Sequence, residues 1–180
     1  MATTAPGLVD AGFASGFAHP LFGLDHLLAM VAVGLLSVQI GGRAIWLVPA
    51  AFVVVIAAGG ALGLAGVPLP QVEGVIALSV VALGLAIAAE RAWPTGVAML
   101  FVAVFAVFHG HAHGAEIPGL ADPLAYVAGF MTATALLHLT GVGIGEAARI
   151  ARESARLRAL AGAVIAGVGL HILLLTYQIV

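Results

Sequence analysis

Two short segments contain five of the seven histidines of this chain, which is otherwise 63% hydrophobic and only 8% charged. They are HPLFGLDH, residues 19–26, and FHGHAHGAE, residues 108–116. Ionisable side chains in such apolar surroundings are costly, and they are functional candidates by default. Imidazole nitrogens combined with carboxylate oxygens suit a divalent transition metal such as Ni, Co, Zn or Cu(II). We therefore predict a metal site built from these two segments.

The first segment offers two imidazoles and a carboxylate. His19 and His26 are seven residues apart, so a continuous helix would place them on one face, about 10 Å apart along its axis. Asp25 lies next to His26 in the sequence. Its carboxylate could bind a cation directly, or it could orient His26 by accepting the second N–H of the ring. The sequence leaves both roles open.

The second segment repeats this chemistry at helical spacing. His109 and His113 are four residues apart and Glu116 follows three later, so a continuous helix would align all three. His111 would then point elsewhere. The two glycines of the segment would allow the backbone to open and change that geometry, which is tolerated at membrane depth where it lines a site. The predicted ligands are His19, Asp25, His26, His109, His113 and Glu116.

The two remaining histidines, His138 and His171, stand alone in later apolar runs. A lone histidine in a membrane helix more often bonds a neighbouring helix than binds a metal, yet either residue could be a relay station for an ion. The same subsidiary role is open to His111. The first set carries more weight, because five costly groups converge on one depth: His19, Asp25, His26, His109 and His113.

The elements that must position these groups are membrane helices. Soluble domains are about 25% charged, so a chain with 8% charged residues is expected to be an integral membrane protein. Crossing a bilayer core takes about 20 apolar residues of helix, and the runs lack the alternation of a barrel strand. We expect an all-α, polytopic membrane protein, a single domain over residues 1–180 with six transmembrane helices, at about 17–40, 44–66, 71–90, 95–113, 122–146 and 158–178.

The arginines predict an orientation. All six follow the first, third or fifth run, and no other basic residue exists apart from histidine. The positive-inside rule then places both termini outside the cytoplasm, and both histidine segments at the outer level. Five of the eight acids belong to the outer half, where they would concentrate cations or would simply be tolerated.

Composition also excludes several classes of function. The chain has no cysteine, which excludes disulfides and thiolate metal sites. No basic patch exists outside one loop, so no nucleic-acid partner is expected. The opening residues carry no basic region of a signal peptide. There is no phosphate-binding loop, which argues against ATP-driven transport.

The two segments resemble the signature motifs of the HupE/UreJ family of hydrogenase and urease accessory proteins. The resemblance extends through LLAMVAVGL after the first motif and fits the size and hydropathy of the whole chain. It implies a secondary permease of the inner membrane for nickel or, in some members, cobalt, which indirectly serves the hydrogenase or urease maturation machinery. It also implies that the ion is taken up through the six predicted ligands, with His111 at a variable position. Many members begin with a signal peptide followed by histidines, and this chain shows neither.

We therefore expect a permease, and not an enzyme, that takes Ni²⁺ (or Co²⁺ or Zn²⁺) into the cytoplasm as its cargo, with no resident cofactor required. The expected partners are the metal ion, the lipid bilayer and other copies of the chain in a homo-oligomer. Histidines that titrate near neutrality would make uptake fall at acid pH.

Two alternatives use the same residues. An intramembrane zinc-dependent hydrolase would hold its metal with histidine and aspartate and activate water. A non-transporting metal-binding membrane protein would bind the ion without moving it. A serine protease is weaker, because neither Ser37 nor Ser79 is expected to lie in a nucleophile-like glycine-rich turn with a paired histidine.

Overall fold

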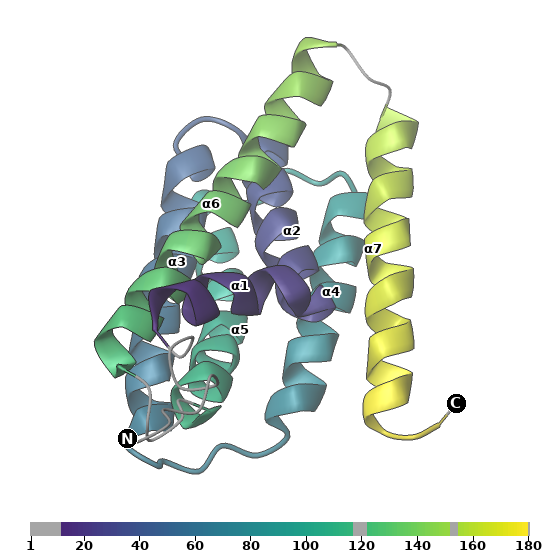
Figure 1. Ribbon diagram of the computed structural model, residues 1–180. Coiled ribbons are helices and arrows are strands. Elements are labelled where there is room, and N and C mark those ends of the chain that lie inside the picture. Colours follow the sequence, from purple (N-terminus) through teal and green to yellow (C-terminus); the bar gives the residue numbers. More distant parts are fainter. Residues whose placement is uncertain (1–11, 117–121, 152–154, 180) are drawn as a thin grey trace, which may run out of the picture.

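The computed structural model describes residues 12–116, 122–151 and 155–179, and this part of the chain forms seven helices and no strand (Figure 1). The all-helical prediction is confirmed for these residues. The helices are α1 (Phe13–Phe22), α2 (Leu24–Ile40), α3 (Ala44–Leu64), α4 (Val72–Ala88), α5 (Thr95–Glu116), α6 (Pro123–Ile150) and α7 (Ala155–Thr176).

Every predicted apolar run contains a helix, with ends within a few residues of those expected. Four helices are long and apolar enough to cross a membrane, namely α3, α5, α6 and α7. The bent pair α1–α2 passes the same test as one unit, whereas α4 is shorter, with 17 residues. The chain thus has the helices of a multi-pass membrane protein. The count of six spans and the orientation of the termini remain predictions.

The first run is not the continuous helix that we expected. It breaks at Gly23, and α1 and α2 meet there at an angle of 81°. Gly23 has an extended backbone that ends α1 and begins α2. Figure 1 shows α1 lying across the bundle while α2 runs along it. The break therefore changes how the histidines on either side of it are presented.

Helix α2 is the centre of the bundle. It packs against all six other helices of the described chain, and several of its apolar side chains are fully buried, among them Met30, Val33 and Leu36. They form one core with side chains of α3 and α4, including Phe52 and Leu83. The first turn of this central helix carries Asp25 and His26, so both lie where several helices meet.

Charged residues gather at the other end of α2, where α4 and α6 also end and α7 begins. A cavity of about 380 Å³ lies there, and Gln39, Glu90, Arg149 and Arg158 are among the residues that line it. The guanidinium Nε of Arg158 is 3.6 Å from a carboxylate oxygen of Glu90. The two ends of the bundle therefore differ in kind, with histidines at one and ion-paired residues at the other.

Candidate metal site

The break at Gly23 brings the two histidines of the first segment together. The ring centroids of His19 and His26 are 6.3 Å apart, closer than the one-helix prediction of about 10 Å along an axis. Helix α1 is held across the bundle by α6, because Gly16 lies directly against the backbone of Tyr126. At the same contact, the Tyr126 hydroxyl lies 2.9 Å from Nδ1 of His19.

The carboxylate of Asp25 contacts both the backbone and the ring of His26. Its Oδ1 accepts the backbone N–H of His26 at 2.8 Å and lies 2.7 Å from Nδ1 of the same residue. The ionised carboxylate can only accept, so Nδ1 carries the proton and donates it. In the neutral ring, Nε2 then keeps its lone pair. Of the two roles left open by the sequence, the geometry matches the orienting one, a pairing common behind metal-bound histidines.

The second segment stays helical throughout, as α5 continues to Glu116. His109 and His113 lie one turn apart and both face the first segment. The ring of His109 is 4.7 Å from that of His26. The ring of His113 is 4.5 Å from His26 and 4.7 Å from His19. Four imidazoles from three helices thus form one group, here called the histidine cluster: His19, His26, His109 and His113.

The glycines of the second segment do not open the helix, contrary to the alternative that we considered. They allow α5 to pack closely on α3. A Cβ atom at Gly110 would overlap the carbonyl oxygen of Ile56, and one at Gly114 would overlap that of Gly60. Small residues commonly bring membrane helices this close. These glycines therefore pack on α3, whereas the two α5 members of the histidine cluster face α1 and α2.

Several nitrogens of the histidine cluster are buried without a hydrogen-bond partner in the described part of the chain. They are Nε2 of His26, Nδ1 of His109 and both ring nitrogens of His113. Buried polar atoms are nearly always paired, so each exception calls for an explanation. An electron-pair acceptor such as a metal cation would satisfy unprotonated imidazole nitrogens. The donor set thus has the chemistry of a transition-metal site.

The side chains are not preset as a closed ion cage. In the described residues, no three or more His, Asp or Glu side chains form a group that could hold a metal ion as they stand. The rings approach edge to face rather than pointing their nitrogens at one centre. Binding would therefore need side-chain rotation, which the absence of fixed partners on His113 permits.

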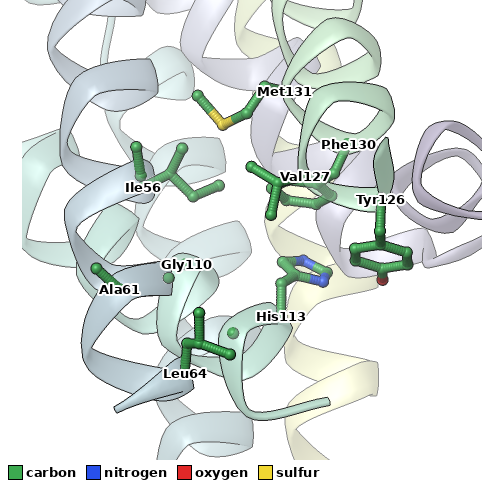
Figure 2. Close-up of a pocket in the computed structure, with 12 residues that line it drawn as sticks. Ile56, Ala61, Leu64, Gly110, His113, Tyr126, Val127, Phe130 and Met131 are labelled. Carbon is green, nitrogen blue, oxygen red and sulfur yellow. The ribbon is translucent and has the colours of Figure 1, made fainter. Parts of the chain in front are cut away.

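Aromatic side chains border the cluster. Phe130 of α6 packs on His113 with ring centroids 4.0 Å apart. An apolar cavity of about 210 Å³ between α3, α5 and α6 reaches His113, whose ring lies beside Tyr126 and Val127 (Figure 2). The cluster is thus bordered on this flank by apolar surface.

Sequence comparisons with known proteins place the chain in a family. The profile of the family described as HupE / UreJ protein matches residues 1–172. The chain belongs to the HupE/UreJ family. Protein HupE of Rhizobium leguminosarum bv. viciae is 48% identical over 165 residues, which cover 88% of this chain and 86% of that protein. No solved structure matches the chain.

HupE/UreJ membership confirms the resemblance drawn from the two motifs. The family is one of accessory and transport proteins associated with nickel and cobalt. The structure brings together four of the six predicted ligands as rings and holds Asp25 against one of them. Glu116 ends α5, but its side chain lies outside the described part of the chain.

The three candidate relay histidines lie in different surroundings. His138 of α6 is buried, donates from Nδ1 to the carbonyl of Thr134 at 2.7 Å, and leaves Nε2 without a partner in the described chain. His111 is turned away from the cluster, and its Nε2 lies 2.6 Å from the carbonyl oxygen of Val67. His171 is exposed on α7. Only His138 is linked to the cluster, through Phe52, whose ring lies 5.7 Å from His109 and 5.0 Å from His138.

Sequence reasoning missed three neighbours of the HupE/UreJ motifs. Tyr126 and Phe52 contact the histidines from other helices, and nothing in their local sequence marks them. The expectation that Ser79 has no paired histidine was wrong, because its hydroxyl lies 2.9 Å from Nε2 of His109. The sequence feature that could have pointed to Ser79 is its hydroxyl in the middle of an apolar run. Its partner depends on how α4 packs on α5.

Proposed function

We propose that this protein is a secondary permease that carries a divalent transition-metal ion into the cytoplasm, with Ni²⁺ as the expected cargo and Co²⁺ as the second. The observation that carries the proposal is the histidine cluster, with its buried nitrogens that lack partners in the described chain. Borderline nitrogen ligands of this kind suit nickel and cobalt. Membership of a family associated with their transport supports the same choice.

The proposed path begins at the outer ends of α5 and α6. The ion exchanges water for imidazole nitrogens at the cluster, where the carboxylate of Asp25 supplies negative charge behind His26. It then passes Phe52 to His138, the next buried imidazole. Further along α6 is the cavity that Glu90 and Arg149 help to line, through which the ion would leave. The inward direction rests on the positive-inside rule, because the arginines mark that end as cytoplasmic.

An incomplete ligand shell is what a carrier needs, since an ion that binds too tightly is not released. The cluster has four rings but no preset group of three or more donors in the described chain. A zinc hydrolase of the kind that we considered would instead hold its metal with three fixed ligands and leave one open position. The loose arrangement of the cluster supports transport over that alternative.

The cellular role follows from the accessory nature of the family. We propose a location in the bacterial inner membrane, where imported nickel would become available to hydrogenase or urease maturation. A homo-oligomeric state is also part of the proposal. Co-purification in detergent, followed by mass measurement, tests the oligomer independently of transport.

Uptake of radioactive nickel by cells that express the protein tests the proposal. His113→Ala removes the ring whose two nitrogens both lack partners in the described chain, so uptake is expected to fall to the level of cells without the protein. His171→Ala is the matched control, since this ring is exposed on α7. Protein levels in the membrane are compared by immunoblot.

Reconstituted vesicles separate a permease from a protein that only binds metal. Ni²⁺ is expected to accumulate inside vesicles that contain the wild-type protein, and excess Co²⁺ is expected to compete. Full uptake by His113→Ala at normal protein level would remove the cluster from the path. Binding without accumulation would replace the permease by a metal-binding protein.

A further inference from the structure

Ser79 of α4 lies outside both histidine motifs but touches the histidine cluster. Its side chain is fully buried, and its Oγ lies 2.9 Å from Nε2 of His109. Which of the two groups donates the proton of this bond depends on the other hydrogen bonds that each of them makes.

The direction of the bond follows from counting hydrogens. A serine hydroxyl has one hydrogen to donate. Oγ of Ser79 donates it to the backbone carbonyl of Ile76 at 2.6 Å, one turn earlier in α4. A carbonyl oxygen can only accept, so this hydrogen is not available to His109. Nε2 of His109 must then be the donor, and Ser79 accepts from it.

The second ring nitrogen of His109 is fixed as a consequence. A neutral imidazole carries one proton, so a ring protonated on Nε2 has an unprotonated Nδ1 with its lone pair exposed to a ligand. Nδ1 is buried and has no hydrogen-bond partner in the described chain. The ring of His26 lies 4.7 Å away between centroids. There Asp25 holds the proton on Nδ1, and Nε2 is the nitrogen without a partner in the described chain.

We propose that Ser79 is a positioning residue that holds the proton of His109 on Nε2 and thereby presents Nδ1 to the metal ion. The placement of the proton stands on the hydrogen bonds alone, whereas the metal as the ligand of Nδ1 rests on the proposed function. Two different acceptors, a carboxylate behind His26 and a hydroxyl behind His109, perform the same task. The hydroxyl does so without adding charge to the interior of the bundle.

The carbonyl of Ile76 is essential to this arrangement. If the hydroxyl were not engaged there, it could donate to Nε2 and favour the opposite tautomer, with the proton on Nδ1. The serine back-bond within α4 therefore selects which nitrogen of a histidine on α5 can bind metal. Such partners behind a ligand typically change metal affinity by about 10- to 100-fold when they are removed.

Nitrogen-15 NMR of the full-length protein in detergent, with labelled histidine, tests the placement of the proton. The His109 signals, assigned by their loss in His109→Gln, are expected to show a protonated Nε2 and an unprotonated Nδ1. In Ser79→Ala this preference is expected to disappear, and Ni²⁺ affinity measured by calorimetry is expected to fall about 10-fold. Ser79→Thr, which keeps the hydroxyl, is expected to restore both.

Ser37→Ala is the matched control. Ser37 of α2 is equally buried and donates to the carbonyl of Gly34 at 2.7 Å, three residues earlier, and this hydrogen bond involves no histidine. This variant loses the same kind of back-bond, so it is expected to keep the wild-type tautomer and Ni²⁺ affinity. An equal loss of affinity in both alanine variants would make the effect of Ser79 one of packing and overturn the proposal.

Two further results overturn the proposal directly: a wild-type His109 with its proton on Nδ1, or a Ser79→Ala variant that keeps the wild-type tautomer. The wild-type spectrum decides the first even if a variant fails to fold. If the expected tautomer is found but the wild-type protein binds neither Ni²⁺ nor Co²⁺, the proposed function fails and Nδ1 loses its role as a ligand. The proton placement by Ser79 would survive that result.

Discussion

The two histidine motifs reach the same cluster by opposite means. The first is interrupted at Gly23, where the chain turns by 81° between α1 and α2. The second remains a regular helix, and its histidines meet the cluster because they are one turn apart. An interrupted backbone places His19 and His26 close together although they are seven residues apart. A continuous backbone keeps the two histidines of the second motif at a set spacing.

The comparison shows that glycine has a different task in each motif. Gly23 lies beside the Asp25–His26 pair, where a Cβ atom would be 3.2 Å from the carboxylate and 3.3 Å from Nδ1 of the imidazole. Gly110 instead lies on the far face of α5, against the backbone of α3. Substitutions in the first motif should therefore disturb the chemistry, whereas glycine substitutions in the second should disturb the packing.

The largest effect is expected from removing the charge of the first motif. Asp25→Asn keeps an oxygen that can accept from His26 but loses the carboxylate, so Ni²⁺ affinity is expected to fall by about 10- to 100-fold. Calorimetry on purified protein measures this. Asp122→Asn is the control, because Asp122 caps α6 through the N–H groups of Leu124 and Ala125, and asparagine caps equally well. Unchanged affinity in Asp25→Asn would make the pair a structural one.

Gly110→Ala in the second motif is expected to have a smaller effect, a loss of folding stability. The new methyl group would overlap the carbonyl of Ile56 and push α5 away from α3, at a cost of about 1–3 kcal/mol typical of overpacking. Unfolding in mixed detergent micelles measures it. Gly143→Ala on α6, where a Cβ atom would meet nothing within 4 Å, is expected to be at least as stable as the wild type. Equal stabilities of the two variants would contradict the packing role.

Gly23→Ala is expected to lower nickel uptake by cells, but less than Asp25→Asn does in the same uptake assay, and to change the stability of the protein little. Its backbone conformation suits alanine, so the effect comes from the methyl group pressing on the Asp25–His26 pair. Gly96→Ala, near the start of α5 and with open space around it, is the control. Wild-type uptake by Gly23→Ala would show that the break tolerates a side chain and that Gly23 is not needed for the chemistry of the first motif.

The smallest effect is expected from His171→Ala. The side chain is exposed on α7, and α7 packs mainly on α4. Uptake at the wild-type level, measured beside the His113→Ala variant, would exclude a relay role for this ring. A marked loss would place His171 on the path in addition to the cluster.

The helices could be predicted from sequence because each of their causes is local. Apolar runs of membrane length give the helix positions, and the Asp122–Pro123 pair marks the start of α6, where the side chain of Asp122 caps the first turn. The break at Gly23 could not be predicted, since a glycine in an apolar run is equally compatible with a straight, tightly packed helix. What decides the break is distant: α1 docks on α6 where Gly16 meets Tyr126.

The site divides in the same way. The histidines were visible as costly groups in an apolar chain, and their spacing placed His109 and His113 on one helical face. The partners that prepare the rings were visible only where they were adjacent in sequence, as Asp25 is. Ser79 is 30 residues from His109, and only the packing of α4 on α5 joins them.

Six helices of the described chain pack in pairs in which glycines let two backbones touch: α1 with α6, α3 with α5, and α4 with α7. The cluster lies where these pairs meet rather than within any one of them. A small slide of one pair past another, the kind of shear that packed helices allow, would part His109 from Ser79 or His19 from His113. A bound ion could thus be released without unwinding any turn of a helix.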